Sequence, residues 1–206
     1  MPEATSMMGF VAAALVAAVV PGPTVAVVVS SGLARGVSAG LASVLGGQAA
    51  LLLMTMVLAL GLEAVLAFMG WAFDLLRLLG AAYLVWMGWR TFSARGGLAF
   101  GPSGPPRRLG AYGVQGFLVV AANPKTLLFF GAFLPQFVDR NEPVAPQVIV
   151  YGLLAMAVAL FSDGAYAVAA GRARHLLDAA RLRLVNRLSG AALMAGGFWL
   201  ALQRRA

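Results

Sequence analysis

Cysteine is absent from this chain of 206 residues, and histidine occurs only once, as His175. The lack of cysteine excludes disulfides, thiol catalysis and thiolate metal sites. One histidine cannot form a histidine-based metal cage without other kinds of ligand. Charged residues are also scarce, at 11%, whereas soluble domains carry about 25%. Because so few charges cannot cover a water-facing surface, we expect an integral membrane protein whose outer solvent is lipid.

Hydrophobic residues make up 61% of the chain. A helix that crosses the bilayer needs about 20 residues with a rise of ~1.5 Å each, so the length allows about six helices with short loops. This leaves no room for a separate soluble enzyme or nucleic-acid-binding domain. We therefore interpret the net charge of +8 as the arginine excess of cytoplasmic loops, and we expect no nucleic-acid partner.

Long uncharged segments predict where the spans lie. No charge occurs between Glu3 and Arg35, and this gap is longer than one crossing. The third span is predicted to begin near Trp71, because the stretch between Arg77 and Arg90 alone is too short to cross. The other predicted spans cover residues 7–32, 38–62, 111–138, 145–171 and 188–203.

The sequence contains an internal repeat. Residues 77–82 read RLLGAA at the start of the third span, and residues 187–192 read RLSGAA at the start of the sixth. Three spans in each unit would insert the second unit upside-down relative to the first, which is the inverted-repeat architecture of secondary transporters. A chance match between alanine-rich helices is the alternative. We predict one all-α transmembrane domain over residues 1–206, divided into a first unit 1–92, a cytoplasmic loop 93–110 and a second unit 111–206.

The distribution of arginine predicts the orientation. The loops after the first, third and fifth spans hold more arginine than the opposite side, so they are expected in the cytoplasm, with both termini outside. These loop arginines are Arg35, Arg90, Arg95, Arg107, Arg108, Arg172, Arg174, Arg181, Arg183 and Arg187.

A proline cluster interrupts the first span, where Pro21, Gly22 and Pro23 precede Thr24. Each proline removes a backbone donor and clashes with the preceding turn, at a cost of ~3 kcal/mol in an ordinary helix. Two prolines around a glycine are therefore predicted to open the helix and to free carbonyls before the break. A new half-helix can begin at Pro23, and its N-terminus suits a carboxylate. A simple kink is the alternative.

The fourth span is predicted to break at Pro124, next to Lys125, which is the only lysine in the chain. An ammonium near the bilayer midplane costs at least ~2.5–3.5 kcal/mol on insertion scales and usually marks a pathway. Snorkelling of the side chain to the headgroups is the alternative. Asn123 adds an amide that can bond freed backbone or ligand, or act only as a local cap.

Asp163 is the other charge deep inside a span. Its carboxyl group could carry a proton, bind an amino group or form a structural bridge with Lys125. Tyr166 lies three residues on, so it shares a helix face with Asp163 and can hydrogen-bond it. Gln48 is a weaker candidate, as it suits a helix–helix contact equally well. The adjacent glycine pair at residues 46–47 is expected to permit close helix packing.

Several motifs resemble the lysine exporter (LysE/RhtB) family in order and spacing. They are PGPT at residues 21–24, LGAAYL at 79–84, NPKT at 123–126 and FLPQFV at 133–138. The resemblance implies a small bacterial inner-membrane protein that exports amino acids or related metabolites, with the two proline motifs along the transport path. It also implies the direction of transport, and some relatives are linked to metal-ion resistance.

These patterns together predict a secondary transporter, not an enzyme, that needs no cofactor and exports a small amino acid or related metabolite by proton antiport. Its partners would be the substrate, protons and the bilayer, and glycine-rich faces allow a homodimer. A metal-ion or other small-cation exporter of the same fold is the alternative, although one deep carboxylate without cysteine makes a poor cation site. The predicted substrate-binding residues are Pro21, Gly22, Pro23, Thr24, Asn123, Pro124, Lys125, Gln48 and Tyr166, and the predicted proton-coupling residue is Asp163.

Overall fold

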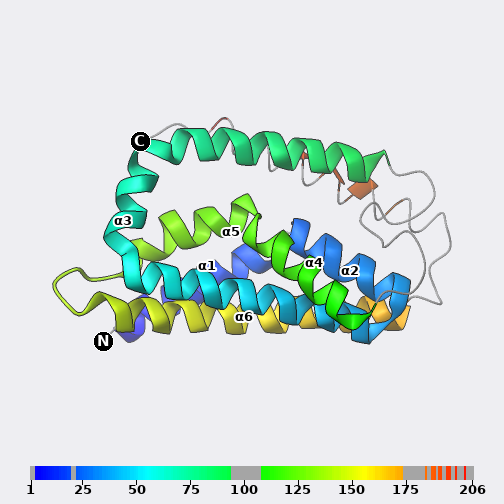
Figure 1. The fold of residues 1–206 in the computed structure, drawn as a ribbon, viewed down its shortest axis with the longest axis horizontal. Coiled ribbons are helices and arrows are strands. Elements are labelled where there is room, and N and C mark those ends of the chain that lie inside the picture. The colour runs from blue at the N-terminus through cyan, green and yellow to red at the C-terminus, as the bar shows by residue number, and fades with distance from the viewer. Residues whose placement is uncertain are drawn as a thin grey trace.

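Every element in the described part of the computed structural model is a helix. The structure describes residues 3–19, 22–93 and 108–173, together with isolated positions between 184 and 202. Figure 1 shows most helices lying along one long axis, with α6 (Val144–Ala173) beside the first part of α3 (Val37–Phe92). The all-helical class predicted from the sequence is confirmed.

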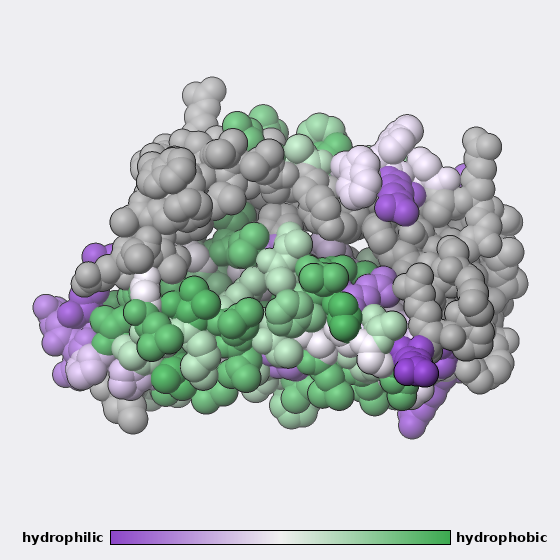
Figure 2. Space-filling view, in the orientation of Figure 1, coloured by the Kyte–Doolittle hydropathy of each residue, from purple (hydrophilic) through white to green (hydrophobic). Residues whose placement is uncertain are grey.

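The hydrophobic surface of these helices identifies the protein as a multi-pass membrane protein. Val37–Leu62 and Val144–Ala173 are each long and apolar enough to cross a bilayer, and counting each of two bent helix pairs as one span gives four. Figure 2 shows hydrophobic residues mainly over the middle of the described surface and hydrophilic residues mainly toward its two ends. These segments correspond to the predicted first, second, fourth and fifth spans. The predicted loop 93–110 and the sixth span lie largely outside the described residues.

The first span is broken into α1 (Ala4–Val19) and α2 (Pro23–Arg35). The two helices are bent by 56°. Pro23 occupies the first helical position of α2, and Gly22 precedes it in an extended conformation as the N-cap. Proline suits this position because its missing amide would have no partner in the helix. The predicted break is thereby confirmed, although Pro21 itself lies outside the described residues.

The fourth span is broken in a similar way, between α4 (Leu109–Ala121) and the short helix α5 (Pro124–Leu128). The bend between Leu109–Ala121 and Lys125–Phe137 is 54°. The helix continues after α5 with a π-helical turn η1 (Phe129–Phe133) and a 3₁₀ turn η2 (Leu134–Phe137). Irregular turns of these kinds inside a helix often mark a functional region.

The second and third predicted spans both fall within α3, which consists of two helices joined across a kink at Gly61, and the predicted start near Trp71 lies inside the second of these helices. Only Gly61, with φ −142° and ψ 33°, departs from helical geometry, and Figure 1 shows the chain turning beyond this point and running back. The segment continues as a helix because it contains no proline and is rich in leucine, alanine and methionine, which favour helix.

Glycines allow α3 and α4 to approach closely. A Cβ atom added to Gly46 would lie 1.8 Å from the carbonyl oxygen of Gly113. One added to Gly116 would lie 2.0 Å from the carbonyl oxygen of Ser43. Protein interiors are close-packed, so neither position has room for a larger residue. The close packing predicted at Gly46 is confirmed.

Replacement of Gly46 by Ala is therefore expected to lower the free energy of unfolding by about 1–3 kcal/mol, because the methyl group must displace the backbone of Gly113. Gly110→Ala is the matched control, since a Cβ at this position in the first turn of α4 meets nothing within 4 Å. Thermal unfolding in detergent measures both variants. Equal unfolding temperatures for the two would contradict this packing.

An aromatic cluster joins α1, the irregular turns and α6. Its members pack ring to ring, with centroids 4.9 Å apart for Phe10 and Tyr151 and 5.1 Å apart for Phe129 and Phe133. Phe10 and Tyr151 are fully buried. The cluster consists of Phe10, Phe129, Phe133, Phe137 and Tyr151. It fills the interior near the N-terminal end of α1.

Candidate functional site

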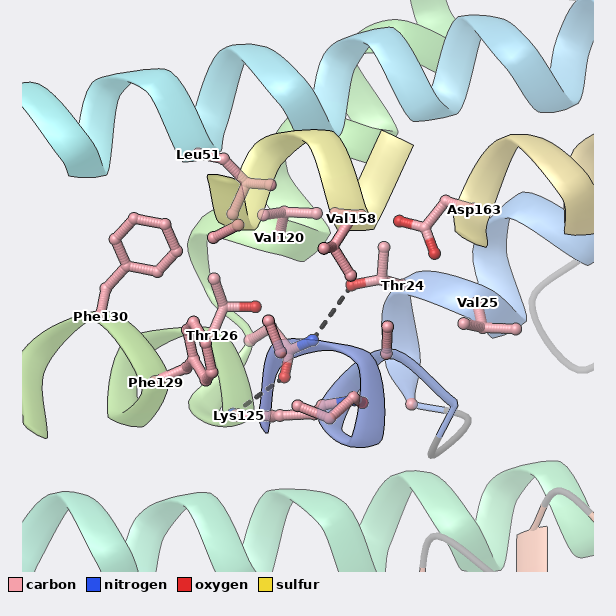
Figure 3. A pocket seen from close by; sticks show the side chains of 17 residues that line it. Thr24, Val25, Leu51, Val120, Lys125, Thr126, Phe129, Phe130, Val158 and Asp163 are labelled. Carbon is pink, nitrogen blue, oxygen red and sulfur yellow. Dashed lines mark hydrogen bonds between the residues drawn. The ribbon is translucent and has the colours of Figure 1, made fainter. Parts of the chain in front are cut away.

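A cavity of about 110 Å³ lies where the two helix breaks meet α6 (Figure 3). Seven elements contribute to its lining, from α1 to α6 and including η1. Most of the lining is apolar. The polar side chains and one glycine of the lining lie at the two helix breaks and on α6. These residues are Gly22, Thr24, Asn123, Lys125, Thr126 and Asp163.

Lys125 connects the second break to the first. Pro21 has no amide hydrogen, so the carbonyl of Ala17, four residues earlier, lacks its regular helical donor. The ammonium of Lys125 donates a hydrogen bond to the Ala17 carbonyl oxygen. Lys125 of the second broken span therefore caps the Ala17 carbonyl of the first broken span, which lacks its usual helical donor.

Asn123 forms a second connection between the breaks. It is only 3% exposed. Its Oδ1 accepts a hydrogen bond of 3.0 Å from the Lys125 amide, and its Nδ2 donates one of 3.1 Å to Thr24 Oγ1. Asn123 is thus the N-cap of α5, as one of the two predicted roles required, and its amide also holds the Thr24 side chain of the first break.

The N-terminus of α2 opens onto the cavity, which Gly22, Thr24 and Val25 line. The N-cap Gly22 has no side chain that could cap the helix. The amides of Thr24 and Val25 belong to the first turn, so they have no acceptor within α2. This helix of 13 residues also places the positive end of its dipole here. The result is a local donor surface for a negatively charged group.

Asp163 lines the cavity from α6. Figure 3 shows its carboxylate on the same side of the view as Thr24, above the level of Lys125. The carboxylate and the Lys125 ammonium interact electrostatically. The cavity therefore has a positive pole, formed by Lys125 and the start of α2, and a negative pole at Asp163.

The other predicted site residues that the structure describes are not part of the cavity lining. Pro23 is fully buried beside it, and Pro124 begins α5. Gln48 lies half-buried on α3. Tyr166 packs against a core formed by Val28, Val44 and Ala167. Pro21 lies outside the described residues.

Several lining residues were not among the predicted site residues. Thr126 directly follows Lys125, and Phe129 and Phe130 lie one turn further on. Ala155 and Ala159 lie two turns and one turn before Asp163 on α6. Residues spaced by four share a helix face, so this periodicity counted from Asp163 would have identified the two alanines.

The fold and the cavity together define the class of protein. A multi-pass membrane protein with two broken helices around a cavity that holds a lysine and an aspartate is a secondary transporter in architecture. The chain belongs to the LysE type translocator family, whose sequence profile matches residues 15–204. The family resemblance noted from the motifs is confirmed, and the protein is a translocator rather than an enzyme.

Three relatives show the extent of the similarity. An uncharacterized membrane protein of Vibrio cholerae is 29% identical over 94% of this chain and 95% of its own. The homoserine/homoserine lactone efflux protein of Salmonella typhimurium is 26% identical over 90% and 91%. The threonine efflux protein of Escherichia coli is 28% identical over 68% and 70%. No solved structure matches the chain.

Proposed function

We propose that this protein exports a small neutral amino acid, such as threonine or homoserine, and binds it as a zwitterion in the cavity between the helix breaks. The observation that carries the proposal is that one cavity has a positive pole, at Lys125 and the start of α2, and a negative pole at Asp163. The free amides of α2 and the Lys125 ammonium suit a carboxylate. The Asp163 carboxylate suits an ammonium group. Relatives that are named threonine and homoserine efflux proteins support the same substrate class.

The size of the cavity supports a small substrate. One water molecule needs about 10–15 Å³ of such space, so about 110 Å³ accommodates a ligand of several heavy atoms. The part of the wall formed by Leu51, Val120 and Phe130 is apolar, which favours an uncharged side chain. Among the described residues, Asp163 is the only carboxylate in the lining, and a metal-ion substrate would need more oxygen ligands.

The transport cycle follows from two inverted units that move against each other. Bends of 56° and 54° in the first and fourth spans support this relationship. A contact between the ends of the two units supports it too, since a Cβ on Gly190 would lie 2.6 Å from the Gly88 carbonyl oxygen. The complete protein would have six spans in a bacterial inner membrane. Rocking of the units would expose the cavity alternately to each side.

The direction of coupling follows from Asp163 and from the arginine distribution. Arginine-rich loops place the N-terminal end of α1 outside, so the aromatic cluster would close the cavity toward the outer face. Asp163 would bind the substrate ammonium when the cavity faces the cytoplasm and a proton when it faces outward. Each exported amino acid would then be exchanged for one entering proton.

Purified protein in proteoliposomes tests the function. Vesicles loaded with unlabelled amino acid are diluted into a panel of labelled amino acids, and counterflow is measured. We expect accumulation of labelled threonine or homoserine and none of lysine or glutamate, with protein-free vesicles as the control. Failure to accumulate any amino acid while the protein remains folded would overturn the proposal.

A further inference from the structure

Thr126 supplies a hydroxyl group to an otherwise apolar part of the cavity wall. The lining near it comes from Leu51, Val120, Phe129 and Phe130, and Figure 3 shows these side chains on the same side of the view as Thr126. None of the four side chains can form a strong hydrogen bond. A polar group in such surroundings is normally satisfied by a specific partner.

The Thr126 hydroxyl has no partner within the part of the chain that the structure describes. Two other threonines in the membrane helices have hydrogen-bonded hydroxyl groups. Thr55 Oγ1 donates a 2.9 Å hydrogen bond to the Leu51 carbonyl oxygen, and Thr24 Oγ1 accepts one from Asn123. Thr126 therefore keeps both a donor and an acceptor available to a molecule in the cavity.

We infer that Thr126 determines substrate specificity by recognising a hydroxyl group on the side chain of the transported amino acid. This inference rests on the proposed function. With its ammonium at Asp163 and its carboxylate at Lys125 and α2, a bound amino acid directs its side chain toward the apolar wall. Thr126 is the hydroxyl-bearing residue there, and a hydroxyl is matched best by a group that both donates and accepts.

Such a site discriminates strongly against an isostere. An apolar pocket hardly distinguishes a methyl from a hydroxyl group, whereas a wall that hydrogen-bonds the hydroxyl leaves its own polar group unpaired when the isostere binds. One neutral hydrogen bond corresponds to a preference of about tenfold. We therefore expect threonine to be preferred over valine, and homoserine over norvaline, by about this factor.

Competition in proteoliposomes measures the preference. Unlabelled threonine or valine competes with labelled threonine for counterflow, in the wild type, in Thr126→Val and in Thr126→Ser. Thr126→Val keeps the shape and removes the hydroxyl, and Thr126→Ser keeps the hydroxyl. We expect the tenfold preference in the wild type and in Thr126→Ser, and its loss in Thr126→Val.

The same preference is measured without transport by the rise in unfolding temperature that each amino acid produces in detergent. This second measurement decides the question if Thr126→Val binds but does not transport. A wild type that does not distinguish threonine from valine would overturn the inference, as would a Thr126→Val variant that keeps the preference. A wild type that neither binds nor transports any amino acid would overturn the proposed function itself, and the inference with it.

Discussion

Asp163→Asn is expected to abolish efflux driven by a pH gradient while exchange of labelled for unlabelled substrate continues. The asparagine carbonyl oxygen can still accept a hydrogen bond from the substrate ammonium, but the side chain cannot bind a proton. Exchange should therefore persist with KM raised about tenfold or more, because the ammonium loses a charged acceptor and keeps only a hydrogen bond to a neutral oxygen. In vesicles with an acidic exterior, the accumulation ratio of the variant should fall to one.

A matched control removes a carboxylate elsewhere. Glu3 lies exposed before α1, outside the cavity, so Glu3→Gln should retain gradient-driven efflux. If Asp163→Asn responds to the pH gradient like the wild type, Asp163 does not carry the proton. The coupling would then use the substrate's own proton or another ion.

Lys125→Met is expected to weaken substrate binding by about 10- to 100-fold, because a charge-assisted hydrogen bond contributes about 1.5–3 kcal/mol. Methionine keeps the approximate length of the side chain and removes the ammonium. The Ala17 carbonyl also loses its donor from the second break, so the unfolding temperature should fall. Substrate titration by counterflow measures the first effect, and thermal unfolding in detergent measures the second.

Lys125→Arg is the control, since it keeps the charge and the capacity to donate. It should preserve more of the substrate affinity than Lys125→Met does. Wild-type affinity in Lys125→Met would exclude the ammonium from substrate binding. If Lys125→Met is unstable and Lys125→Met/Asp163→Asn restores both stability and transport, the two residues form a structural pair.

The helix breaks could be predicted from the sequence because their causes are local. A proline removes its own amide and blocks the turn before it, whatever surrounds the helix. The loss of the regular donor to the Ala17 carbonyl follows from Pro21 by counting four residues. That Lys125 provides the replacement could not be predicted, since its position depends on how the second broken span packs against the first.

The side chains that face the cavity were harder to predict than the breaks. Gln48 and Tyr166 were chosen for polarity and spacing, but neither feature fixes the rotation of a helix about its axis. Tyr166 accordingly packs in a core with Val28. The end of the second predicted span at residue 62 agrees with the kink at Gly61, because a long uncharged segment marks one crossing of the bilayer.

Single-cysteine protection tests most directly whether an amino acid binds in this cavity, because the chain has no cysteine of its own. Ala155 and Val158 line the cavity, whereas Arg140 is exposed in the loop before α6. A cysteine is introduced at each position, and its alkylation rate is measured with and without substrate. We predict that threonine slows alkylation of Ala155→Cys and Val158→Cys but not of Arg140→Cys. Unchanged alkylation at both cavity positions, at threonine concentrations that saturate transport by the same variants, would contradict binding in the cavity.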